Sequence, residues 1–200
     1  MVSSLVVTLF CLLVFAGIIG WLIGIFNTLV RQKNQINNAL AQIDVQLKRR
    51  HDLIPNLVEA AKGYMTQEKT TLQAVIYARN HASQLQAQNP ILDNQTLAQI
   101  AQAETALSSA LGRFYMVAES YPELKADGVI KDLFDEITNT ENRISFARQH
   151  YNDSVMFYNN NREIFPNNFI SSMFQFHAIN SLEFADKSQI AQSPKITLHS

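Results

Sequence analysis

Two charged residues stand at positions where the sequence otherwise places apolar side chains on the inner faces of helices. Arg50 interrupts the apolar spacing of its segment, and Glu141 lies between Ile137 and Ile144. Opposite charges on facing helices form ion pairs, whereas an unpaired interior charge is costly. Nearby polar side chains can extend such a pair by hydrogen bonds. The candidate polar network comprises Arg50, Asp52, Glu141, Asn142, Arg143, Arg148 and Asn152.

This network has a structural and a functional interpretation. In the structural one, the ion pair fixes the register of the helices. In the functional one, the charges line a pocket or a groove that binds a partner. We favour the structural interpretation, because an unpaired charge at these positions would be costly.

The sequence contains no short motif that assembles a catalytic or metal site. It lacks His-Glu-x-x-His, Gly-x-Ser-x-Gly, a phosphate-binding glycine loop and a Cys/His metal pattern. His51 and His150 could meet across a bundle, but two imidazoles without a third ligand make a poor metal site. A net charge of −1 gives no overall field that attracts nucleic acid. We therefore expect no enzymatic activity, cofactor, metal ion or nucleic-acid partner.

Long amphipathic helices must position these side chains. Residues 31–166 contain only three glycines and are rich in Ala, Leu, Gln, Asn, Glu and Lys, a composition that favours helices. Apolar residues recur at helical spacing over three stretches, from Ile36 to about His81, Leu97 to Tyr121, and Ile130 to Tyr158. Short connections between them indicate antiparallel neighbours. The predicted fold is all-α, an antiparallel up-and-down bundle of three to four long helices after an N-terminal membrane-spanning helix.

Pro55 leaves the number of helices open. The apolar spacing of the first stretch continues straight through it. Proline removes one backbone donor and crowds the carbonyl four residues earlier, so the chain either kinks within one helix or turns between two. The unbroken spacing favours the kink.

Residues 5–26 are predicted to span a lipid bilayer. This stretch has no charged, Asn, Gln or His side chain, and every charged residue of the chain lies at or after Arg31. A helix of this length reaches ~33 Å, which suffices for a hydrocarbon core ~30 Å thick. A cleavable signal peptide is the alternative, but no basic residue precedes the stretch and no Ala-x-Ala-like site follows it. We expect an uncleaved anchor.

Charge and residue size near this span suggest its orientation and its contacts. Arg31 and Lys33 follow the span, which places the C-terminal part in the cytoplasm and the N-terminus outside. Small residues recur every four positions at Ala16, Gly20, Gly24 and Thr28. Such a stripe permits close approach of another membrane protein or a second copy of the chain, although glycine is common in spanning helices without that role.

The last residues change in character. Phe165, Phe169, Met173 and Phe176 have spacing suited to a short helix, which we expect to pack on the bundle rather than on the membrane because Lys and Arg are scarce there. Residues 185–200 have the composition of a loose tail. The predicted divisions are an anchor at 1–30, a bundle at 31–166 and a C-terminal segment at 167–200.

Three stretches of the sequence are distinctive: QIDVQLKRRHDLIPNLVEAAKGY at 42–64, LGRFYMVAESYPELKA at 111–126 and TENRISFARQHYNDSVMFYN at 140–159, followed by Phe165-Pro166. In this order they resemble the LemA family. The resemblance implies a single-pass protein of the bacterial inner membrane with a cytoplasmic four-helix bundle, which makes Pro55 a possible helix boundary. It implies no catalytic residues or cofactor. Phe114-Tyr115-Met116 and the residues after Phe184 depart from the family pattern.

These observations favour a membrane-anchored scaffold or adaptor without catalytic activity. The alternative is a membrane-tethered sensor of a small ligand, with the bundle opening around Arg50 and Glu141. An enzyme with an unrecognised site is the third hypothesis, because sites assembled from distant residues escape motif searches.

Overall fold

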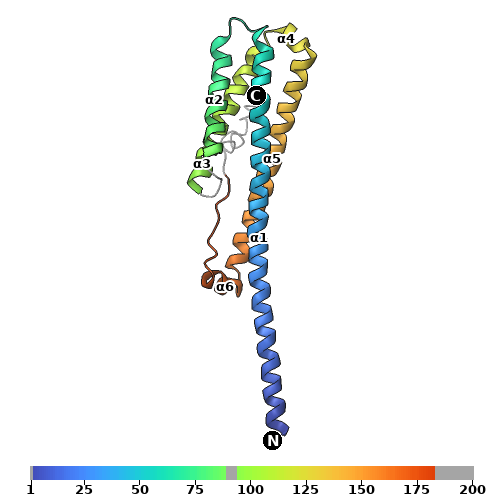
Figure 1. The fold of residues 1–200 in the computed structure, drawn as a ribbon, viewed down its shortest axis with the longest axis vertical. Helices are drawn as coiled ribbons and strands as arrows, with labels where there is room; N and C mark the ends of the chain where they lie inside the picture. The colour runs from blue at the N-terminus through green and yellow to red at the C-terminus, as the bar shows by residue number, and fades with distance from the viewer. Residues whose placement is uncertain (1, 89–93, 183–200) are drawn as a thin grey trace, which may run out of the picture. The chain divides into compact units, whose positions relative to one another are not determined.

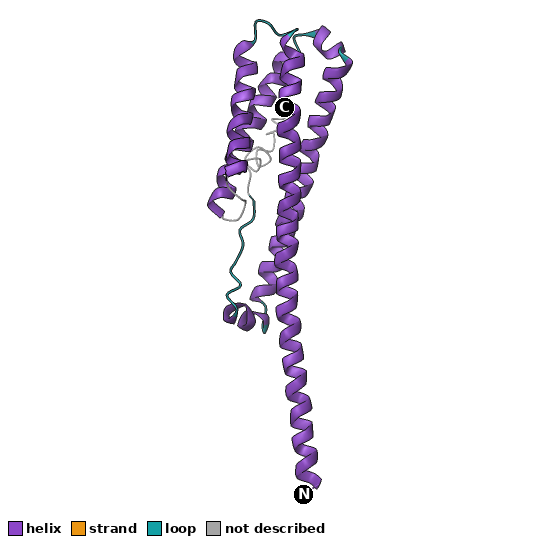
Figure 2. Ribbon diagram, viewed as in Figure 1, coloured by secondary structure: helices purple, strands orange, loops and turns teal. Residues whose placement is uncertain are grey.

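The computed structural model describes residues 2–88 and 94–182, and within that part of the chain every regular element is a helix (Figures 1 and 2). The predicted all-α helical bundle is confirmed. Four helices are long and two are short. Their bounds are α1 (Val2–Lys62), α2 (Lys69–Gln88), α3 (Asn94–Ala118), α4 (Pro122–Ala126), α5 (Gly128–Glu163) and α6 (Asn167–Met173).

The described residues form two compact units. The first contains residues 2–41 and 149–181, and the second contains residues 42–88, residues 94–148 and Leu182. Helices α1 and α5 each supply residues to both units. The predicted divisions at residues 30 and 166 remain predictions.

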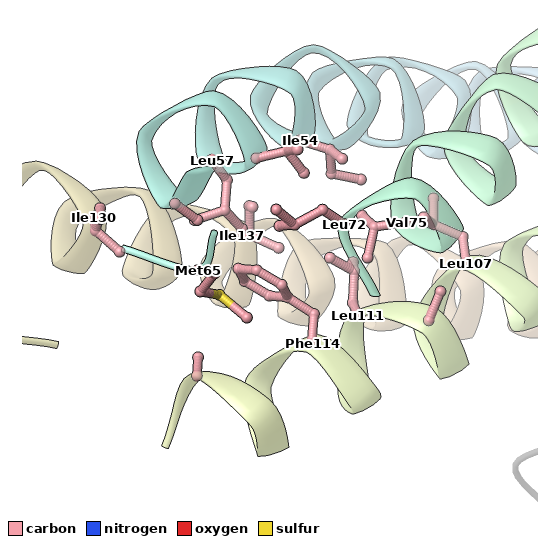
Figure 3. Packing of buried hydrophobic residues seen from close by; sticks show 14 of the residues in the cluster. Ile54, Leu57, Met65, Leu72, Val75, Leu107, Leu111, Phe114, Ile130 and Ile137 are labelled. Atoms are coloured by element: carbon pink, nitrogen blue, oxygen red, sulfur yellow. The ribbon is translucent and has the colours of Figure 1, made fainter. Parts of the chain in front are cut away.

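The core of the second unit is formed by all of its helices. Figure 3 shows apolar side chains from α1, α2, α3 and α5 pointing toward one another, with Met65 beside the ring of Phe114. Leu107 and Leu111 of α3 are among the fully or almost fully buried members. Apolar burial of this kind is the main favourable term in folding.

The first amphipathic segment ends earlier than its spacing predicts. The prediction carried it on to about His81, but α1 ends at Lys62 and α2 begins at Lys69. Gly63 follows the end of α1, and glycine has low helix propensity. Met65 then turns into the core with no exposed surface, whereas Tyr64 is partly exposed. Burial of Met65 therefore accompanies the reversal of the chain.

Pro55 lies inside α1, which continues through it to Lys62. The residues on both sides of it are buried on one face, including Ile54 and Leu57. This result agrees with the unbroken apolar spacing and excludes a helix boundary at Pro55.

The turn from α4 into α5 is built from residues with clear local roles. Pro122 is the first residue of α4, where its missing N–H has no helical partner to lose. Asp127 Oδ1 accepts hydrogen bonds from the amides of Val129, at 2.8 Å, and Ile130, at 3.1 Å, which caps the N-terminus of α5. Tyr64 Oη donates to Asp127 Oδ2 at 2.9 Å.

The predicted short helix after Phe165 is present as α6, but its apolar face differs from the prediction. Ile170 and Ser171 are its buried residues, whereas Phe169 and Met173 are exposed. These two exposed side chains do not pack on the bundle as predicted. The predicted tail at residues 185–200 lies outside the described residues.

The Asp127 cap predicts a pH-dependent contribution to stability. The amide of Ile130 and the Tyr64 hydroxyl lower the pKa of Asp127 below its ordinary value, with the amide of Val129 as a smaller cause. A lowered pKa stabilises the folded chain above the ordinary value and loses that effect as the pH falls through the lowered one. We expect the full-length chain in detergent to melt at a higher temperature than Asp127→Asn at neutral pH, with a difference that shrinks in acid. A difference independent of pH would contradict this assignment.

Candidate functional site

A cluster of charged side chains lies in the second unit around Arg50 of α1. Arg50 is only 2% exposed. Its Nη1 donates to Glu104 Oε2 at 3.4 Å, and its Nη2 donates to Ser108 Oγ at 2.7 Å. The same Nη2 lies 3.3 Å from Oε2 of Glu141, whose side chain is 50% exposed. Arg50 therefore joins α1 to both α3 and α5.

The next residue of α1, His51, completes the cluster. Its Nε2 lies 2.7 Å from Glu104 Oε1, and both side chains are buried. Ser108 Oγ donates to Glu141 Oε1 at 3.3 Å. Both oxygens of Glu104 and both oxygens of Glu141 thus have partners inside the cluster.

A separate contact joins α2 to the same turn of α1. Arg79 Nε donates to the backbone oxygen of His51 at 2.8 Å. In an uninterrupted helix that carbonyl would accept from the amide four residues later, but that residue is Pro55, which has no N–H. The Arg79 guanidinium therefore supplies the donor that the proline removes.

Two buried polar atoms beside the cluster have no hydrogen-bond partner among the described residues. They are Nε of Arg50 and the hydroxyl of Tyr115. Burial raises the pKa of Tyr115 to about 12, with the negative charge of Glu141 acting in the same direction and the Arg50 cation opposing it. The phenol is therefore protonated at neutral pH. Its ring packs against Phe134, with the centroids 5.1 Å apart.

The structure brings together only part of the predicted polar network. Arg50 and Glu141 meet as the spacing indicates. Asp52 lies apart from them, with Oδ1 4.0 Å from Arg79 Nη2. Asn142 and Arg143 are exposed and form no hydrogen bond or ion pair within the described chain. Arg148 and Asn152 are half-buried farther along α5, and neither is a described partner of Arg50 or Glu104.

Sequence reasoning missed Glu104, although the signal was present. Glu104 stands between Ile100 and Leu107 on the apolar face of its helix, at the spacing that singled out Arg50. His51 was considered only as a weak metal ligand beside His150, and it pairs with Glu104 instead. Ser108 lies one turn after Glu104, but an uncharged serine there does not stand out from the sequence pattern as a buried charge does. A contact such as that of Arg79 with a backbone oxygen leaves no pattern in a single sequence.

The cluster joins α1 to α3 and α5. Ser108 Oγ is bonded to Arg50 and Glu141, and the described bonds of His51 Nε2 lead to Glu104. Across residues 2–88 and 94–182, no group of three or more His, Cys, Asp or Glu side chains could hold a metal ion. An open recess lies elsewhere, in the first unit. Its lining is Arg162, Glu163, Asn168, Ser171, Ser172, Gln175, Phe176 and His177.

The N-terminal part of α1 is apolar and uncovered. Within the described chain, α1 is the one helix long and apolar enough to cross a membrane, and its most apolar window contains no buried residue. The stripe residues are all exposed, and a Cβ added at Gly20 or Gly24 would lie in open space. Thr28 Oγ1 donates to the Gly24 carbonyl at 2.8 Å. Among the described residues, the stripe Ala16, Gly20, Gly24 and Thr28 is therefore an exposed face of α1.

The burial of the cluster predicts unequal effects of removing its two carboxylates. We expect Glu104→Ala to cost about 3–5 kcal/mol, because it leaves the Arg50 cation buried with less compensation. Glu141→Ala should cost only about 0–1 kcal/mol, because Glu141 is half-exposed and solvent screens its charge. Chemical denaturation of the full-length chain in detergent measures both, with Tyr115→Phe as a near-neutral control. Equal costs would contradict the assignment of Glu104 as the main partner.

The contact of Arg79 with the His51 carbonyl predicts an energetic coupling to Pro55. Arg79→Ala should cost about 1–3 kcal/mol, because it leaves a buried carbonyl without a donor. Pro55→Ala restores a backbone N–H to that carbonyl, so the Arg79 truncation should cost less in its presence. A double-mutant cycle from denaturation curves should give a coupling of about 0.5–3 kcal/mol. Additive effects would show that the two residues act independently.

Comparison with known proteins agrees with the resemblance in the sequence. The LemA family model matches residues 39–198, which is most of the chain and begins after the apolar part of α1. Protein LemA of Metamycoplasma hominis is similar, with 24% identity over 157 residues that cover 78% of this chain and 68% of that protein. The matched residues include Arg50, Glu104 and Glu141. This chain belongs to the LemA family.

Proposed function

We propose that this protein is a non-catalytic scaffold or adaptor, anchored in the bacterial inner membrane by the N-terminal part of α1. One observation carries the proposal. A single helix contains both the uncovered apolar stretch and residues of the bundle core such as Ile54 and Leu57. An apolar surface of that size is unfavourable in water, and a lipid bilayer removes it from water.

The cationic residues after the span set the proposed orientation. Arg31 and Lys33 follow the apolar stretch, so the positive-inside rule places the helical bundle in the cytoplasm and the N-terminus outside. In that orientation the bundle is available to proteins at the inner face of the membrane.

The proposed contact inside the membrane is made by the stripe Ala16, Gly20, Gly24 and Thr28. Its exposure supports docking of a second membrane helix, either from another membrane protein or from a copy of this chain. Small residues allow two backbones to approach closely, which strengthens van der Waals packing between helices.

A ligand sensor is the second candidate, and one observation favours it. The unpartnered Nε of Arg50 and hydroxyl of Tyr115 are buried beside the half-exposed Glu141. A small polar molecule that entered between α1 and α3 would find a donor and a phenol there. Such a molecule would stabilise the folded chain by mass action.

Crosslinking in native membranes followed by mass spectrometry tests the adaptor proposal. We expect one membrane protein, or the chain itself, to be recovered reproducibly with full-length wild type. Gly20→Leu should abolish that recovery, because it fills the stripe without touching the chain's own fold.

Ile18→Phe is the matched control, because residue 18 lies on the opposite side of the helix from residues 16 and 20. It should leave recovery unchanged. Loss of recovery in both variants would point to general damage to the span. Recovery of no partner, together with a small molecule that raises the melting temperature of the full-length chain, would favour the sensor.

A further inference from the structure

Exposed apolar side chains surround α6 in the first unit. The side chains of Phe165 and Phe169 are 81% and 75% exposed, and Met173 and Phe174 are also exposed. Single exposed apolar residues are ordinary, but a contiguous group of this kind marks an interaction surface. We name it the α6 surface, consisting of Ile164, Phe165, Phe169, Met173 and Phe174.

The α6 surface lies at the level where the apolar stretch of α1 ends. Phe26 is the last residue of that stretch. Its ring packs edge-on against Phe174, with the centroids 4.9 Å apart, and against Phe176, with the centroids 5.6 Å apart. In a chain whose residues 5–26 span the bilayer, these contacts place α6 at the membrane–water interface.

Hydrogen bonds on both sides of α6 hold this surface in place. Before it, the Asn167 side chain donates to the Asn161 carbonyl at 3.0 Å, and Ser171 Oγ donates to the Arg162 carbonyl at 3.1 Å. After it, Tyr158 Oη donates to the His177 carbonyl at 3.0 Å. The exposed aromatic side chains therefore project from a fixed backbone.

Asn159 and Tyr151 of α5 extend this attachment. The Asn159 amide donates to the Ile179 carbonyl at 2.8 Å and accepts from the Ile179 amide at 3.2 Å. Tyr151 Oη donates to the Asn180 carbonyl at 3.1 Å. The chain after α6 is thus held along α5 by its backbone.

The chemistry of the α6 surface favours lipid as its occupant. Residues 164–174 contain no charged side chain, only apolar residues, Pro, Asn and Ser. The nearest cation on the chain, Arg162, is paired with Glu163 at 2.7 Å. Free amphipathic helices use Lys and Arg to reach a membrane, but a covalent anchor already supplies a high local concentration of the surface. The absence of basic residues is therefore compatible with lipid contact.

We propose that the α6 surface inserts into the interfacial region of the bilayer beside the span, so that the chain contacts the membrane at two places. The proposal rests on the membrane anchoring proposed above. The aromatic and Met side chains occupy the boundary between headgroups and acyl chains. The second contact restrains the tilt and rotation of the anchor through Phe26.

Fluorescence quenching in vesicles tests both contacts separately. The full-length chain with Cys11→Ala and Phe169→Cys carries an environment-sensitive dye at residue 169, and Trp21 is the only tryptophan. In phosphatidylcholine vesicles, lipids brominated along the acyl chain should quench Trp21. Lipids with a quencher near the headgroup should quench the dye, whose emission shifts to the blue.

Tyr77→Cys is the matched control, because Tyr77 is an aromatic residue of similar exposure, 77%, outside the α6 surface. A dye there should show neither quenching nor a blue shift. Adding anionic lipid should leave the result at residue 169 unchanged, because the α6 surface has no charge.

The outcomes separate the two proposals. Quenching of Trp21 without quenching at residue 169 overturns the α6 contact and leaves the anchor intact. A blue-shifted dye that no lipid quenches overturns it in favour of cover by a second copy or another protein. A Trp21 that lipids do not quench overturns the anchor and, with it, the α6 proposal.

Discussion

The buried charge of Arg50 is the constraint on which the arrangement of the bundle depends. A cation removed from water must have anionic partners in fixed positions. Glu104 of α3 and Glu141 of α5 supply them, and the neighbouring His51 shares the carboxylate of Glu104. Arg79 of α2 also binds the backbone of His51. The single turn of α1 that holds Arg50 and His51 therefore contacts all three other long helices. We infer that this turn fixes the register of α1 against α3, since a shift by one turn would separate Arg50 from Glu104, and neither charge can stay buried alone.

Apolar packing around this turn of α1 holds the helices together but does not fix how far one helix slides along another. Leu107 and Leu111 would be buried after many small rearrangements of α3, because apolar contacts tolerate sliding. The ion pair and the hydrogen bonds tolerate much less, because their atoms must lie within about 3 Å of each other. Apolar packing and the charged cluster therefore have different roles in the second unit. The core drives the helices together, and the charged cluster selects one alignment.

The elements of the fold could largely be predicted from periodicity, whereas the contacts between them could not. Spacing located the long helices and singled out Arg50, because both depend on local order along one chain segment. The same rule applied to the second stretch would have found Glu104. The end of α1 at Lys62 could not be predicted, because the apolar pattern continues on both sides of it. The burial of Met65 in the turn is visible only in the structure. The Arg79 contact depends on which residue of α2 packs beside Pro55, and a single sequence does not reveal how two helices pack.

The attachment of the segment after α6 has a consequence for how the family can vary. Tyr158, Asn159 and Tyr151 of α5 bind backbone atoms of His177, Ile179 and Asn180 and make no demand on the side chains there. These bonds therefore leave the side chains at 177 and 180 unconstrained, and at residue 179 they require only the N–H, which excludes proline there. Drift in sequence should concentrate on the segment that is held, while the three residues that hold it stay under selection.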